Sequence, residues 1–241
     1  MTSKENWTLR AAVLMLALVL ITSCFVGGTF AKYVTSGDAG DNARVAKWGV
    51  SITAHGTGDI FAKEYDAVAG QDNTVIAGGE YKVIAPGTKK DNATLVTLSG
   101  KPEVSVRVTY SAEHFCLTGK WEGDETSRFY CPLIIKVTGK VGDTVKTETI
   151  NCVGKTSAKE VETAVKNAVA ACSATYGPNT DLSTVAGDGL KISWEWPFEG
   201  TTNLGQTDEM DTYLGDQAAK TSDLDVPSIH IPVTATVTQI D

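Results

Sequence analysis

The chain lacks the motifs on which most enzymes depend. Its three histidines, His55, His114 and His230, lie in three separate segments. It contains no H-E-x-x-H, no G-x-S-x-G and no glycine-rich phosphate loop. Its cysteines also lack the close pair that is typical of zinc sites. These absences favour a protein that is not an enzyme and that needs no cofactor.

Positive charge is scarce as well. The chain has 21 Lys and Arg against 29 Asp and Glu, and its formal net charge is −8. Binding to a nucleic acid requires clustered Lys and Arg that displace the counterions of the phosphates, so we expect no nucleic-acid partner. Beyond residue 31, no apolar run is long enough to span a membrane.

Residues 1–31 have the pattern of a secretory signal peptide. Lys4 and Arg10 precede an apolar stretch over residues 11–26, and small residues follow it. The pattern predicts that a signal peptidase cleaves between Ala31 and Lys32. The protein would then be secreted, and it would contact the membrane only before cleavage.

Cys24 offers a competing export route. The residues before it resemble a lipoprotein processing box, in which the cysteine would be acylated. The residues after it are still apolar, where a lipoprotein usually continues with a polar tether. We therefore favour cleavage after Ala31 over lipidation at Cys24.

The mature chain keeps an even number of cysteines, which in an exported protein predicts two disulfides. The candidates are Cys116, Cys131, Cys152 and Cys172. Four cysteines permit three connectivities. The spacing favours Cys116 with Cys131 and Cys152 with Cys172, because each of these bonds closes a short loop.

Most of the mature chain alternates between apolar and polar residues, with the period of two that is typical of half-buried β-strands. The longer candidates are residues 46–54, 104–110, 190–198 and 229–237, and the shorter ones are residues 81–84, 94–98, 133–137 and 144–150. Glycine and proline turns separate them, and Pro232 should mark an edge or a bulge. The pattern predicts an all-β fold, a two-sheet β-sandwich over residues 46–241.

Residues 156–176 have a helical period instead. Ser157 and Glu160 form a capping box at the start, and Gly177 and Pro178 follow the end. We therefore expect one α-helix, inserted between strands.

An acidic cluster is one candidate ligand site. Its members are Asp208, Glu209, Asp211 and Asp216. Carboxylates can hold calcium, but the cluster lacks the ligand spacing of an EF-hand. We favour a solvated acidic loop with a short helical turn.

An aromatic stripe, Trp194, Trp196 and Phe198, lies on one face of a predicted strand. Such a stripe can bind sugar rings, but it more often fills a core. Leu190 and Ile192 continue the same face, so we favour the core.

Residues 27–33, GGTFAKY, resemble the distinctive signal-peptide end of the TasA/camelysin family, which comprises secreted matrix fibre proteins of Gram-positive bacteria. The turn over residues 85–87 and the final strand over residues 229–239 are similar to that family's order of elements. The four cysteines of the mature chain and the helix between them depart from the better-known members.

The resemblance implies a jelly-roll subunit of a biofilm-matrix fibre, located in the extracellular matrix or on the cell surface. It implies that residues 32–45, a polar segment that we expect to be flexible, insert as a donor strand into the sheet of the next subunit. The candidate anchors are Tyr33, Val34, Ala43 and Val45. The implied partners are other copies of the chain, a dedicated signal peptidase and other matrix proteins.

Two alternatives stay open. The chain could be a monomeric surface module that binds glycan or calcium through the aromatic stripe or the acidic cluster. It could also be a metalloprotease, an activity described for camelysin relatives, although no zinc-binding helix motif is present.

Overall fold

The computed structural model describes residues 7–20, 44–55, 60–66, 74–186, 189–198, 205–220 and 225–240. The chain divides into two compact units, Met1–Val45 and Ala46–Asp241. In the first unit, residues 7–20 form a helix. Among the described residues, no helix has both the length and the apolar character that crossing a membrane requires. The predicted cleavage site, Ala31 and Lys32, lies outside the described residues.

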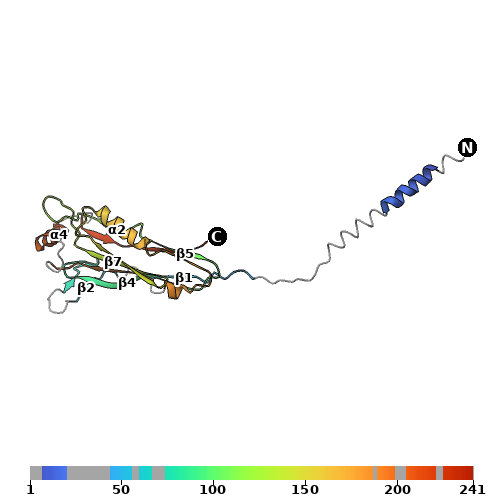
Figure 1. The fold of residues 1–241 in the computed structure, drawn as a ribbon. Coiled ribbons are helices and arrows are strands. Elements are labelled where there is room, and N and C mark those ends of the chain that lie inside the picture. The colour runs from blue at the N-terminus through green and yellow to red at the C-terminus, as the bar shows by residue number, and fades with distance from the viewer. Residues whose placement is uncertain are drawn as a thin grey trace. The chain divides into compact units, whose positions relative to one another are not determined.

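The second unit consists mostly of β-strands in antiparallel sheets (Figure 1). A five-stranded sheet has the order β1 (Ser51–Ala54), β4 (Lys89–Ser99), β10 (Leu190–Glu195), β7 (Ile134–Val141) and β8 (Thr144–Asn151). A three-stranded sheet has the order β12 (Thr234–Gln239), β5 (Val106–Ser111) and β9 (Ala174–Tyr176). Two smaller sheets pair β11 (Ser228–His230) with β6 (Cys116–Thr118), and β2 (Glu64–Tyr65) with β3 (Val75–Ile76). The predicted all-β, sandwich-like class is confirmed.

One apolar core joins the two larger sheets. Alternate residues of β5 and of β10 are buried and belong to the same cluster: Val106, Val108, Tyr110, Leu190, Ile192 and Trp194. Full burial of a large apolar side chain stabilises the fold by about 1.5–3 kcal/mol. The apolar residues whose alternation predicted these two strands are therefore the residues that pack in the core.

Four of the predicted strands need correction. The segment 190–198 is a strand only as far as Glu195, so Trp196 and Phe198 follow the end of β10. The segment 46–54 becomes a strand only at Ser51, because Gly49 has a φ of +55° that interrupts the extended backbone. All four residues of β1 are exposed, although the pattern predicted a half-buried strand. The segment 229–237 divides into β11 and β12, which pair with different strands on either side of Pro232. The segment 81–84 forms only an isolated bridge at Val83.

The inserted helix, α2 (Ala158–Ala170), is shorter than predicted. Ser157 caps it by accepting a hydrogen bond from the Glu160 N–H at 3.3 Å. The capping box is displaced by one residue, since the Glu160 carboxylate accepts from the N–H of Thr156, at 2.9 Å, rather than from that of Ser157. Residues 174–176, predicted as helix, form β9, because they pair with β5.

The expectation of one helix in this unit is wrong. A short helix, α3 (Leu182–Val185), precedes β10, and α4 (Asp208–Lys220) replaces the predicted acidic loop. Thr207 caps the start of α4, because its Oγ1 accepts from the Met210 N–H at 3.3 Å and its carbonyl accepts from the Asp211 N–H at 3.1 Å.

The close approach of β10 to β4 requires glycine at position 189. Gly189 has a φ of +65°, and a Cβ there would lie 1.6 Å from the Val96 carbonyl oxygen. Gly142, in the turn between β7 and β8, has a φ of +62° but open space around it. Both glycines therefore have a positive φ, but only at position 189 would a Cβ also clash with a neighbouring strand.

We predict that Gly189→Ala destabilises the fold by more than about 3 kcal/mol or prevents folding, because strain and overpacking add. Gly142→Ala, the matched control, should cost about 1 kcal/mol. Urea unfolding of both variants measures the difference. Equal losses would contradict the close packing of β10 on β4.

Candidate functional site

The open edges of the sheets are the candidate site for assembly. An edge strand presents backbone N–H and C=O groups without a partner, which is a template for pairing with another chain. β1 and β8 bound the five-stranded sheet, and β12 and β9 bound the three-stranded sheet. The question is which of these edges is open to a further strand.

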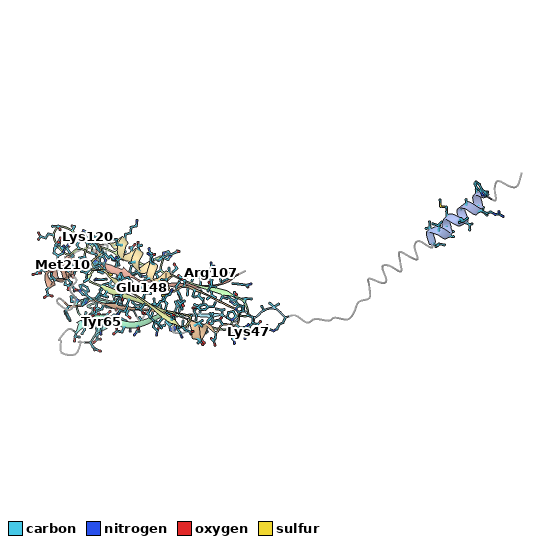
Figure 2. All side chains as sticks on the ribbon, viewed as in Figure 1. Lys47, Tyr65, Arg107, Lys120, Glu148 and Met210 are labelled. Carbon is cyan, nitrogen blue, oxygen red and sulfur yellow. The ribbon has the colours of Figure 1, made fainter. Side chains whose placement is uncertain are left out.

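The edges differ in charge. β8 carries the exposed residues Lys146 and Glu148, the latter labelled in Figure 2. Lys146 also donates a hydrogen bond through Nζ to the Ala171 carbonyl, at 3.0 Å. Charged side chains on an edge discourage pairing with another chain. β1, with the sequence SITA, and β12, with the sequence TATVTQ, carry no charge.

β12 combines its uncharged edge with one half-buried face. Ala235 and Val237 pack against the core, whereas Thr234, Thr236 and Thr238 are exposed. Within the described part of the chain, β12 makes its hydrogen bonds with β5, in a register that runs from Thr234 opposite Ser111 to Gln239 opposite Val106. We define this free side of residues 234–239 as the β12 edge. It offers unpaired backbone together with a side-chain alternation that can set a register.

Of the predicted donor-strand anchors, only Val45 lies in the described residues, and its side chain is 90% exposed. Tyr33, Val34 and Ala43 lie outside them. The chain enters the second unit at Lys47, whose N–H donates to a Glu103 carboxylate oxygen at 2.8 Å. Lys47 and Met210 lie at opposite ends of this unit (Figure 2). The exposed Val45 therefore lies two positions before Lys47, whose hydrogen bond to Glu103 holds the chain at one end of the unit.

The aromatic stripe lies in the core. Trp194 is 2% exposed and Trp196 is 5% exposed, and Phe198 is half-buried. The indole N–H of Trp194 donates to the Ile60 carbonyl at 2.7 Å, and its ring packs against Phe61 with the ring centroids 5.3 Å apart. The core interpretation is confirmed for the two tryptophans.

The acidic residues are spread around α4. Asp208, Glu209 and Asp216 are exposed, whereas Asp211 is only 6% exposed and points inward. Among the described residues, no three His, Cys, Asp or Glu side chains come together as a possible metal site. The structure thus gives the four acidic residues different surroundings instead of one shared site.

Asp211 anchors α4 to the rest of the unit. The Tyr130 hydroxyl donates to Oδ1 of Asp211, and the Gln206 amide donates to Oδ2 at 2.8 Å and to the Pro197 carbonyl at 2.6 Å. Burial raises the pKa of the Asp211 carboxyl above its ordinary value, and the hydrogen bonds from Tyr130 and Gln206 offset part of that rise. Sequence reasoning missed this role, although Thr207, Asp211 and Leu214 have the spacing of one helix face.

The four cysteines of the second unit are thiols in this structure. Cys131 and Cys152 are both 0% exposed. Burial raises the pKa of the Cys131 thiol, and the neighbouring Cys152 thiol raises it further.

The pairing of Cys152 with Cys172 that the spacing favoured does not match the fold. Cys152 lies beside Leu133, at one end of the β7–β8 hairpin. Cys172 lies against Gly139, six positions further along β7. At 3.3 Å per residue these places are about 20 Å apart, whereas a disulfide joins Cα atoms at about 4.4–6.8 Å.

Comparisons with known proteins find no similarity for this chain: no family model, no curated protein and no solved structure matches it.

We predict that Asp211 makes the stability of the fold depend on pH. Because its pKa is raised in the native state, its contribution is fully present below about pH 4, where the unfolded carboxyl is also protonated, and is lost as the pH rises through the native pKa. The stability of the wild type relative to Asp211→Asn should therefore fall between acid and neutral pH.

Urea unfolding at a series of pH values measures this difference. Glu209→Gln, on the exposed face of α4, controls for the change in net charge. If the stability of the wild type relative to Asp211→Asn instead increased as the pH rises, burial would not be the dominant influence on the pKa of Asp211.

Proposed function

We propose that this chain is a non-enzymatic structural subunit of an extracellular fibre or matrix. Residues 32–45 of one copy would add as a strand to the β12 edge of the next copy. The observation that carries the proposal is the β12 edge itself, which is uncharged, half-buried on one face and, among the described residues, paired with a strand on one side only.

The physical basis is β-strand addition. Backbone hydrogen bonds along the edge supply affinity for any extended segment, and alternate side chains select the register. On β12, Ala235 and Val237 would continue a core face beneath an added strand. Apolar residues of the donor, of which Val45 is 90% exposed here, would cover that face.

The contact would be head-to-tail, because the donor segment and the β12 edge are different surfaces. A contact between two different surfaces propagates into a filament unless its rotation closes a ring. Cleavage after Ala31 would release the end of the donor from the leader. Cleavage would then act as the switch between subunit and fibre, and would place the protein outside the cell.

A jelly-roll topology, implied by the resemblance to the TasA/camelysin family, is part of the same proposal. It is supported by sheet neighbours that are not consecutive along the chain, such as β4, β10 and β7 in one sheet and β12, β5 and β9 in the other. Such orders require connections that pass between sheets, as in Greek-key folds.

A monomeric module that binds glycan or calcium finds less support. Its aromatic stripe would have to face solvent, and Trp194 and Trp196 are buried. Its acidic cluster would need carboxylates that converge, and Asp211 already accepts hydrogen bonds from Tyr130 and Gln206.

We predict that a chain that begins at Lys32 forms filaments and that a chain that begins at Ala46 does not, because the latter lacks the donor. Residues 46–241 form a compact unit, so the shorter chain should stay folded. Electron microscopy and size-exclusion chromatography, with and without reductant, measure the difference. If both chains stay monomeric at high concentration, or both form filaments, donor insertion is wrong.

We predict that Thr236→Lys, at the β12 edge, raises the concentration needed for filament formation at least tenfold, because a charge on an edge opposes pairing. Thr147→Lys is the matched control, since it makes the same change at an exposed position of β8. Both variants should retain the thermal midpoint of the wild type within a few degrees. Equal effects of the two variants on assembly would exclude β12 as the acceptor.

A further inference from the structure

Cys131 and Cys152 are brought together by the β7–β8 hairpin. Strand pairing places Ile134 opposite Asn151, and the Cys152 N–H continues the ladder by donating to the Leu133 carbonyl at 2.9 Å. Cys131 is two residues before Leu133, so the two cysteines lie diagonally across the end of the hairpin on its inner face. Both side chains are 0% exposed, and the neighbouring Cys152 thiol helps to raise the pKa of the Cys131 thiol.

The other two cysteines lie too far apart for a second bond. The N–H of Leu117, next to Cys116, donates to a Glu162 carboxylate oxygen at 3.3 Å. Cys172 follows Glu162 by ten positions along and just beyond α2, which corresponds to about 15 Å at 1.5 Å per residue. Cys116 and Cys172 are therefore not partners within one folded chain.

We infer that Cys131 and Cys152 are a site of oxidative cross-linking, and that they form the single disulfide among the four cysteines that the structure describes when the chain folds in an oxidising compartment. The inference does not depend on the proposed assembly. It replaces the expected two disulfides, Cys116–Cys131 and Cys152–Cys172, with one bond that joins a cysteine from each of those pairs.

The oxidant is a small disulfide such as oxidised glutathione. The thiolate of one cysteine attacks that disulfide, which gives a mixed disulfide and releases one glutathione thiol. The second cysteine then attacks the mixed disulfide, so that the Cys131–Cys152 bond forms and a second glutathione thiol leaves. Two protein thiols are oxidised and one small disulfide is reduced to two thiols. Because both cysteines are buried in the native state, the exchange takes place before the hairpin is packed.

The test uses the full chain, purified in mild detergent, unfolded, and refolded with a mixture of oxidised and reduced glutathione. Each of the five cysteines of the full chain falls in its own tryptic peptide: residues 11–32, 108–120, 129–136, 147–155 and 167–191. After alkylation without reductant, mass spectrometry should find peptide 129–136 joined to peptide 147–155, and the peptides of Cys116 and Cys172 alkylated. Recovery of both peptides as separate alkylated species, or joined to either of the others, would overturn the inference.

A second measurement does not depend on mapping. Oxidation should raise the thermal midpoint by about 5–10 °C, because the bond closes a loop of roughly 20 residues in the unfolded chain. Cys172→Ala, at the other end of the same hairpin, should keep this rise, and the double variant Cys131→Ala/Cys152→Ala should lose it. A rise that persists in the double variant, or that disappears in Cys172→Ala, would contradict the assignment.

Discussion

The fold depends on the position of β10 at the centre of the five-stranded sheet. β10 is hydrogen-bonded on both sides, to β4 and to β7, and its inner face buries Leu190, Ile192 and Trp194. The indole of Trp194 also holds the segment around Ile60 through a 2.7 Å hydrogen bond. Since β10 already has a partner strand on each side, a further strand cannot pair with it. Any surface that recruits a further strand is therefore at an outer strand, either β1, β8, β9 or β12 of the larger sheets or a strand of the two-stranded sheets β11–β6 and β2–β3.

The buried polar cluster at α4 shows how an acidic segment can serve structure. Asp211 is taken out of water, a position that is unfavourable for a carboxylate unless its oxygens find donors. Tyr130 and Gln206 supply these donors, and Leu214 packs on the same face of the helix. The exposed neighbours Asp208 and Glu209 lie in the first turn, where negative charge is favourable beside the helix dipole. The acidic residues of this segment thus have structural roles: Asp211 attaches the helix to the core, and Asp208 and Glu209 stabilise its first turn.

Sequence predicted those parts of the fold that follow from local pattern. The stripe over Leu190, Ile192 and Trp194 was assigned to the core, and a turn was expected between segments 133–137 and 144–150, where the structure joins β7 to β8. The errors arose where a single backbone angle or a contact between residues far apart in the sequence determines the local structure. Gly49 shortens β1 through a positive φ that hydrophobic alternation does not reveal, and α4 depends on Tyr130, which is 81 positions away from Asp211. The cysteines were ranked by loop length, which neglects the rigid spacing that a hairpin and a helix impose.

The edge strands β8 and β12 differ in the charge of their exposed side chains. β8 carries Lys146 and Glu148 on its exposed surface, and Lys146 is tied to the end of α2. The end of its hairpin also holds the contact between Cys131 and Cys152. β12, by contrast, has alternating threonines and small apolar residues and no charge. If solubility alone governed the edges, both would carry charge, because each exposes the same backbone groups. β1 and β9 also carry no charge, and β12, with six residues, is the longest of these three uncharged edges. Its length and its half-buried face are the reasons to propose it as the acceptor.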